Sequence, residues 1–123
     1  MIAREGVTLT LDASVAVAEA LFHSLSDRAR LQIVQRLAAG ELRVTDLVAE
    51  MGLPQSTVSK HLACLRECGL VSGRPEGRQI FYSLARPELL ELLAVTETLL
   101  AATGNAVALC PTYGRAATRK KGS

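Results

Sequence analysis

The stretch "RVTDLVAEMGLPQSTVSKHLACLREC", residues 43–68, predicts two short helices joined by a tight turn. Its first half places apolar side chains at helical spacing, namely Leu47, Val48 and Met51. Gly52 suits the left-handed residue that ends such a helix, and Pro54 is tolerated at the start of the next one, where a backbone N–H has no intrahelical partner. The second helix is expected to reach about Glu67, with an apolar face formed by Val58, Leu62 and Leu65. This pair is typical of a helix-turn-helix.

Two more helices are expected before this unit. An Ala-rich helix is predicted at about residues 13–24, with Asp12 as its N-cap. A second is predicted at about residues 27–38, where Ser26 or Asp27 can start it. Its helically spaced apolar residues are Leu31, Val34 and Leu37.

The pattern after the unit changes to that of a β-hairpin followed by a long helix. Residues 70–74 and 79–84 are predicted as two strands, and "PEG" between them as the turn. A helix is then expected from Pro87 to about Thr103. Its apolar side chains cover more than one face of the helix: Leu89, Leu90, Leu92, Leu93, Leu99 and Leu100. Because a small domain buries only one of those faces, this pattern favours a dimer held by the first and last helices.

Composition limits the class of protein. The 123 residues suffice for one small domain, and a 49% hydrophobic but 3% aromatic composition favours a mainly helical core of Leu, Val and Ala. Four basic residues lie in the last nine positions, so residues 1–114 carry a net negative charge, and any nucleic-acid contact must use a local patch. No membrane-length apolar run or signal peptide is found, so we expect a cytoplasmic protein with no membrane partner. Cysteines there favour metal or redox chemistry over disulfides.

Three sequence patterns together resemble the ArsR/SmtB family of dimeric winged-helix repressors. They are "D-x-x-R-x-x-I" from Asp27, "L-x-Q-S-x-V-S-x-H-L-x-x-L" from Leu53 and "G-L-V-x-x-x-x-E-G-R-x-x-x-Y" from Gly69. The resemblance implies a mainly α winged helix-turn-helix homodimer that binds operator DNA and releases it on binding an inducer. It predicts a flexible arm at residues 1–11, a DNA-binding and dimerisation domain at 12–103, and a tail at 104–123.

The resemblance also suggests where an inducer binds. One branch places Cys-x-Cys at the start of the first helix-turn-helix helix, where this chain has Arg43 and Thr45. Another uses Asp and His along the last helix, which here contains neither. The CmtR-like cadmium and lead sensor branch carries "H-L-x-C-L-x-x-C-G-L" and a third cysteine in the tail, matched here by Cys64, Cys68 and Cys110. The resemblance implies that the tail cysteine reaches the partner's helix.

The three cysteines fit soft-metal chemistry. Residues four apart share one helical face, and thiolates favour soft ions over Mg(II) or Ca(II). Three thiolates suit Cd(II) or Pb(II), and also As(III), whereas Zn(II) normally needs a fourth ligand such as His61. The alternatives are inert buried thiols and a redox- or persulfide-sensing pair, although adjacent helical turns hold a disulfide poorly. His23 is interpreted as structural or exposed, and no organic cofactor is expected.

The predicted DNA contacts lie in two places. The start of the second helix-turn-helix helix enters the major groove and offers Gln55, Ser56, Thr57, Ser59 and Lys60. The hairpin, or wing, offers Arg74, Arg78 and Gln79. The alternatives are helix capping by Ser56 and Thr57, and ordinary surface charge for Lys60 and Arg78. No nucleophile–base set, phosphate loop or catalytic carboxylate pair can be assembled, so an enzyme is not expected.

Overall fold

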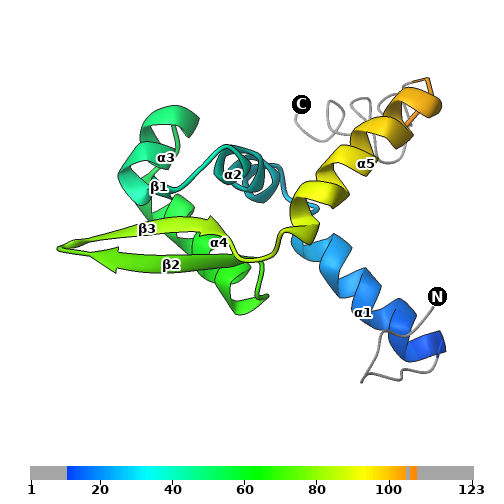
Figure 1. Cartoon of the computed structure of the whole chain (residues 1–123), viewed down its shortest axis with the longest axis horizontal. Helices are drawn as coiled ribbons and strands as arrows, with labels where there is room; N and C mark the ends of the chain where they lie inside the picture. Colours follow the sequence, from blue (N-terminus) through cyan, green and yellow to red (C-terminus); the bar gives the residue numbers. More distant parts are fainter. Residues whose placement is uncertain (1–10, 105, 108–123) are drawn as a thin grey trace. The chain divides into compact units, whose positions relative to one another are not determined.

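The computed structural model describes residues 11–104, 106 and 107, and the chain divides into two compact units at Arg86–Pro87. Most of the predicted arm, and the tail from residue 108 with Cys110, lie outside the described residues. The first unit (Figure 1) contains α1 (Leu11–Ser24), α2 (Arg28–Ala38), β1 (Leu42–Arg43), α3 (Val44–Met51), α4 (Gln55–Glu67), β2 (Val71–Glu76) and β3 (Gln79–Leu84). The second contains α5 (Glu88–Ala102). The predicted winged helix-turn-helix is confirmed; the domain bounds stay a prediction.

The core of the first unit lies between α2, α3 and α4. Apart from Ile33, the buried side chains at its centre come from the predicted apolar faces: Ile33, Val34, Leu37, Leu47, Val58, Leu62 and Leu65. The predicted inward position of Leu31 was wrong, since its side chain is 38% exposed and Ile33 is buried instead. The buried face of α2 therefore keeps the predicted Val34 and Leu37 and is completed by Ile33 in place of Leu31.

Local capping explains where these helices begin and end. The Asp27 carboxylate accepts hydrogen bonds from the backbone N–H groups of Ala29 and Arg30, at 2.8 and 3.2 Å, and so caps α2 as predicted. Asp12 does not cap α1, because α1 begins one residue earlier and Asp12 lies in its first turn. Gly52 ends α3 with φ 67°, the left-handed conformation that its sequence position predicted.

The wing belongs to a three-stranded antiparallel sheet in the order β1-β3-β2. The short strand β1 was not predicted, since a two-residue strand has no sequence period. The turn was placed wrongly as well. Glu76 pairs with Gln79, so the turn residues are Gly77 and Arg78, and Pro75 lies within β2 opposite Ile80. An edge strand tolerates the missing N–H of proline, and the positive φ that the turn needs, 64°, falls on Gly77.

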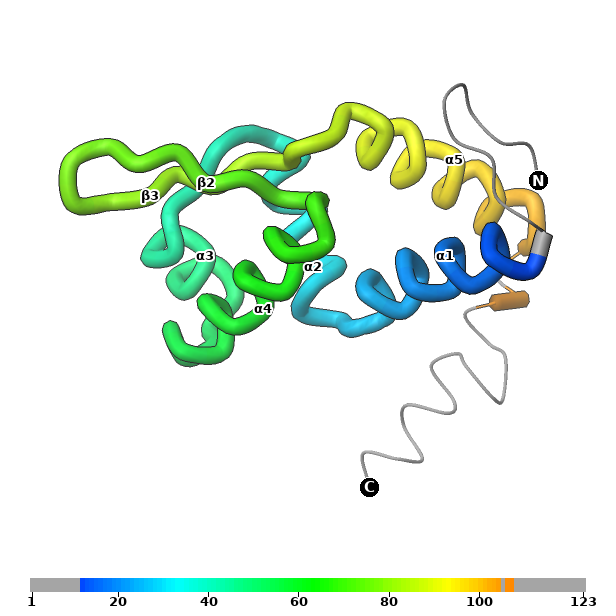
Figure 2. Tube along the Cα trace, turned by 90° about the horizontal axis from the view of Figure 1, so that it is seen from below, coloured from blue at the N-terminus to red at the C-terminus, as the bar shows by residue number. Residues whose placement is uncertain are grey.

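Figure 2 shows the β2–β3 hairpin projecting beyond α3 and α4. The wing and the start of α4 therefore lie on one side of the first unit, which positions the residues predicted to contact DNA.

The second unit presents a helix with several exposed apolar side chains. α5 follows Pro87 and ends before Gly104, whose φ is 59°. The exposed large apolar residues of α5 are Leu90, Val95, Leu99 and Leu100. None of the helices in the described ranges is long and apolar enough to span a membrane.

We expect Leu62→Ala to lower the free energy of unfolding by about 2–5 kcal/mol, because the Leu62 side chain is 1% exposed and its loss leaves a cavity between α2 and α4. Leu31→Ala, at an exposed position, serves as the matched control and should cost less than about 1 kcal/mol. Urea unfolding at one fixed protein concentration measures both. Equal losses for the two variants would contradict the core described above.

Candidate nucleic-acid interface and thiol site

The start of α4 is open to solvent and is not closed by a side-chain cap. Pro54 occupies the N-cap position, and its carbonyl accepts from the N–H groups of Thr57 and Val58, both at 3.1 Å. Ser56 and Thr57 lie inside the first turn of α4 and do not occupy its N-cap position. The predicted contact residues are all exposed except the half-buried Thr57: Gln55, Ser56, Ser59 and Lys60.

The basic side chains predicted to reach DNA differ in how their charge is compensated. Arg74 donates two hydrogen bonds to Glu41, at 3.1 and 2.9 Å, and lies 3.5 Å from a carboxylate oxygen of Glu76. The hydrogen bond from Arg74 lowers the pKa of the Glu41 carboxyl. Within the described ranges, Lys60 and Arg78 form no ion pair. The geometry therefore supports Lys60 and Arg78 as phosphate contacts more strongly than Arg74.

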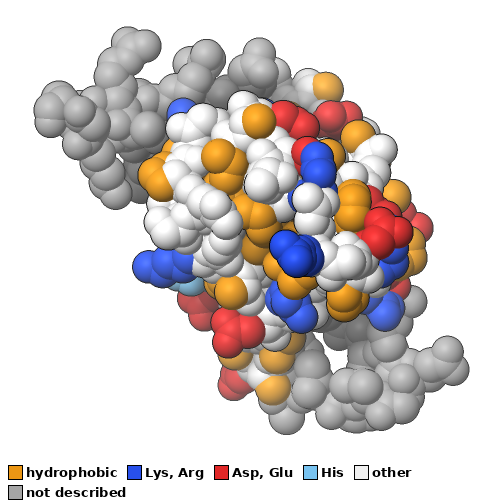
Figure 3. Space-filling model, turned by 90° about the vertical axis from the view of Figure 1, so that its left-hand side faces the viewer, with side chains coloured by type: hydrophobic (Ala, Val, Ile, Leu, Met, Phe, Trp, Pro, Cys, Tyr) orange, Lys and Arg blue, Asp and Glu red, His pale blue; other side chains and the backbone are white. Residues whose placement is uncertain are grey.

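The side of the first unit that carries the wing has Lys and Arg side chains near its centre, next to apolar ones, and Asp and Glu toward its margins (Figure 3). A locally basic face of this kind is what a chain with little net charge needs for binding nucleic acid.

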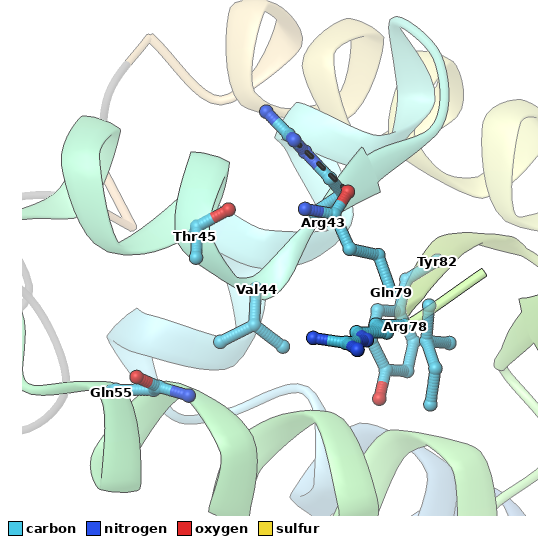
Figure 4. A pocket seen from close by; sticks show the side chains of 8 residues that line it. Arg43, Val44, Thr45, Gln55, Arg78, Gln79 and Tyr82 are labelled. Carbon is cyan, nitrogen blue, oxygen red and sulfur yellow. Dashed lines mark hydrogen bonds between the residues drawn. The ribbon is translucent and has the colours of Figure 1, made fainter. Parts of the chain in front are cut away.

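A pocket of about 230 Å³ joins the wing to the starts of α3 and α4 (Figure 4). Its lining consists of Arg43, Val44, Thr45, Gln55, Arg78, Gln79, Ile80 and Tyr82. Three predicted contact residues are thus brought together, whereas Ser56, Thr57, Ser59, Lys60 and Arg74 lie outside it. Arg43 and Thr45 were missed as binding candidates. Their place at the start of the first helix-turn-helix helix is the signal that could have found them.

Arg43 is the most connected side chain of this pocket. Its guanidinium donates to both oxygens of Asp46, at 3.0 and 2.8 Å, and to Gln79 Oε1 at 3.0 Å. These hydrogen bonds from Arg43 lower the pKa of Asp46 to about 2. Arg43 and Arg74 also lie over the Phe81 ring, 5.9 and 5.2 Å from its centroid. The first half of β3, from Gln79 beside the turn to Phe81, is thereby fixed to Arg43 and, through Asp46, to α3.

The two described cysteines lie at the other end of α4. Cys64 is half-buried and Cys68, which follows the last helical residue, is exposed. Both line a pocket of about 520 Å³ with residues of α1 and the start of α2: Ala16, Glu19, Ala20, His23, Ser24 and Arg30. Partial burial, followed by the neighbouring Cys64 thiol, raises the pKa of Cys68. The small side chains of α1 leave room beside the thiols for an ion and a further ligand.

The described residues alone do not complete a metal site. No group of three or more His, Cys, Asp or Glu side chains among them is close enough to hold an ion. His61 lies 3.4 Å from an Arg30 nitrogen and 3.8 Å from an Asp27 oxygen, and it does not line the thiol pocket. His23 lines that pocket, which its sequence position did not predict. The two thiols thus suit a soft ion, and the described residues do not hold a third ligand within reach of them.

Comparison with known proteins relates this chain to bacterial transcriptional regulators. The profile described as bacterial regulatory protein, arsR family, matches residues 27–72. A probable mercury resistance operon repressor of Streptomyces lividans is 35% identical over 89 residues, which cover 72% of this chain and 71% of that protein. The transcriptional regulator CmtR of Mycobacterium tuberculosis is 40% identical over 85 residues, covering 69% and 72%.

Solved structures agree with this relationship. The homodimeric winged helix-turn-helix DNA-binding domain Mb0332 from Mycobacterium bovis superimposes with a TM-score of 0.67 at 28% identity, over 80% of this chain and 91% of that one. These proteins are transcriptional regulators or DNA-binding domains, not enzymes. The helix-turn-helix, the wing, the profile match and the 35–40% sequence identity to these regulators agree, so the chain belongs to the arsR family of bacterial regulatory proteins.

Proposed function

We propose that this chain is a homodimeric transcriptional repressor that releases operator DNA when a soft metal ion binds Cys64, Cys68 and Cys110. The observation that supports the proposal is that the two ends of α4 carry different functional groups. Its exposed, uncapped start holds the predicted DNA contacts, and its end holds two thiols that line one pocket. An ion bound at one end of a rigid helix acts directly on the position of the other end. As a regulator of the chromosome, the protein acts in the cytoplasm.

The ligand set favours Cd(II) or Pb(II). Thiolates four residues apart on a helix close on one ion, and soft ions accept three sulfur ligands without a fourth. As(III) fits the same ligands and is the second candidate. The relative from Streptomyces lividans is named for mercury resistance, so Hg(II) also belongs among the ions to test. Zn(II) is less favoured, because His61 is engaged with Arg30 and Asp27 instead of facing the thiols.

Redox sensing by the same cysteines is less well supported. Reactive sensor thiols have a lowered pKa, since the thiolate is the nucleophile. The pKa of Cys68 is instead raised by burial and by the thiol of Cys64. A thiol of this kind is a slow target for oxidants, yet a metal ion displaces its proton on binding.

Metal titration of the reduced protein tests the proposal. The reporter is a duplex that the metal-free protein selects from a random pool, and thiolate-to-metal absorption is recorded on the same samples. We expect absorption bands to grow in step with release of DNA on addition of Cd(II) or Pb(II), and neither change with Mg(II). Release that needs an oxidant and is reversed by a reductant would support the redox alternative instead.

Lys60→Ala is expected to weaken binding to every duplex and to lower the slope of log K against log salt by about 0.9, the value of one lost phosphate contact. Gln55→Ala should instead relax the preference at particular base pairs, since glutamine can bond adenine through both amide atoms. Binding isotherms at several salt concentrations measure both effects. An unchanged affinity and slope for Lys60→Ala would make Lys60 an ordinary surface charge.

A further inference from the structure

The pocket between α3, α4 and the wing holds a glutamine whose amide orientation is fixed. Gln79 faces the Arg43 guanidinium, which has hydrogen-bond donors only. The atom of Gln79 that meets Arg43 must therefore be the oxygen, and the amide NH₂ is left to donate elsewhere. Arg43 cannot turn away easily, because two further hydrogen bonds hold it to Asp46.

The rest of the pocket also favours an anion. Arg78 and Arg43 line it, together with the Thr45 hydroxyl, and no carboxylate is among its lining residues. Figure 4 shows the Arg78 side chain extending from the wing toward the side where Val44 and Gln55 lie. Gln55 is the first residue of α4, so the positive end of the α4 dipole lies at this pocket, whereas the Asp46 carboxylate already compensates the start of α3.

The position of the pocket selects the kind of anion. It lies between the helix that is proposed to enter the major groove and the turn of the wing. In the proposed mode of binding, the DNA strand that borders the groove passes between these two elements. A guanidinium with nearby neutral donors suits the geometry of a phosphodiester.

We propose that this pocket binds one backbone phosphate of duplex DNA, with Arg78, Gln79 and Thr45 as its donors. Arg43 is a positioning residue. Its hydrogen bond to the Gln79 oxygen leaves the amide NH₂ of Gln79 free to donate to the phosphate, while its own positive charge is paired with the Asp46 carboxylate. The inference rests on the proposed DNA-binding function. It adds a site whose contacts are independent of base sequence.

The test uses the metal-free full chain and three unrelated duplexes of equal length, one AT-rich, one GC-rich and one mixed. Arg78→Gln is expected to lower the salt slope by about 0.9 on all three. Thr45→Val and Gln79→Leu should each reduce affinity roughly 2- to 12-fold on all three, with the slope unchanged, because each removes a neutral hydrogen bond.

Two variants test the positioning role of Arg43. Arg43→Met combined with Asp46→Asn removes the ion pair without changing the net charge. This variant should lose as much affinity as Gln79→Leu without any change of slope, and adding Gln79→Leu to it should cost no more affinity. Gln79→Glu keeps, as an ion pair, the link to Arg43 that supports the fold, but removes the donors and adds a negative charge. Its affinity should fall more than about tenfold. Thermal unfolding confirms that each variant is folded.

Other results would contradict either the phosphate site or the positioning role of Arg43. Wild-type affinity for Gln79→Glu, or a loss confined to one duplex, would exclude a phosphate site here. A slope lowered by about 0.9 in Arg43→Met with Asp46→Asn would show that Arg43 contacts phosphate itself. Lys60→Ala is the positive control, since it should lower the slope through a contact outside the pocket. Arg36→Gln is the negative control and should leave the slope unchanged, because Arg36 pairs with Glu50 at 3.2 Å, away from the pocket. If Lys60→Ala weakens binding but the pocket variants do not, the phosphate pocket is excluded and the proposed DNA-binding function stands. If the wild type binds no duplex, both the phosphate pocket and the proposed function are excluded.

Discussion

Replacement of Cys64 or Cys68 by serine is expected to abolish metal-triggered release of DNA and to leave metal-free DNA binding unchanged. A hydroxyl is a poor ligand for a soft ion. Loss of a residue that only supports a metal ligand costs about 10- to 100-fold in affinity, so loss of the ligand itself should exceed roughly 100-fold for Cd(II). Metal-free binding is preserved because neither thiol belongs to the buried face of α4, and both lie at the opposite end of α4 from Gln55.

The deciding measurement is operator affinity with and without saturating Cd(II) for the wild type and the single variants. Cys110→Ser is expected to keep weaker Cd(II) binding through the helical pair but to lose the release of DNA, since the connection between α4 and the tail is gone. A coupling of about 1–3 kcal/mol corresponds to a 5- to 150-fold change in DNA affinity. Release by Cys110→Ser equal to that of the wild type would exclude the tail from the switch.

His23→Asn provides the matched control for the cysteine variants. His23 lines the same pocket as both thiols but is not one of the proposed ligands. Its Cd(II) response should equal that of the wild type. A response as weak as that of Cys64→Ser would instead make His23 a ligand, and the all-sulfur site would be wrong.

Leu99→Glu is expected to convert the proposed homodimer to monomers and to remove tight DNA binding with it. Val95 and Leu99 lie four residues apart on one face of α5, and their side chains are 62% and 58% exposed in the single chain. A carboxylate placed in an apolar contact between two copies costs several kcal/mol, so the dimer dissociation constant should rise at least about 100-fold. Monomers then contact one half-site instead of two.

Sedimentation at micromolar concentration measures the association state, and binding to the selected duplex measures its consequence. Glu97→Gln, on the same helix and also exposed, is the control and should remain dimeric. Val95→Glu should reproduce the effect of Leu99→Glu. If both glutamate variants stay dimeric, α5 is not needed for association, and the exposed Val15, Val17 and Phe22 of α1, the other helix of the predicted interface, are the candidates.

The sequence by itself determined the helix-turn-helix and the position of two thiols at the end of the helix that is predicted to read DNA. Both depend on contacts three or four residues apart, which a helix fixes without help from the rest of the chain. The buried face of α4, the left-handed Gly52 and the cap at Asp27 all follow from such local rules. Even the last strand, Gln79–Leu84, has the predicted bounds, because its β-forming residues are contiguous.

Only the tertiary structure decided which of the candidate side chains are available. Arg74 was predicted to contact DNA from its place in the wing, but Glu41, 33 residues away, binds its guanidinium. Arg43 reaches Gln79 across 36 residues, and that contact fixes which face of the amide is open. Strand pairing also moved the wing turn onto Gly77 and Arg78. Partners of this kind come from distant elements, and no local period encodes where the fold brings them together.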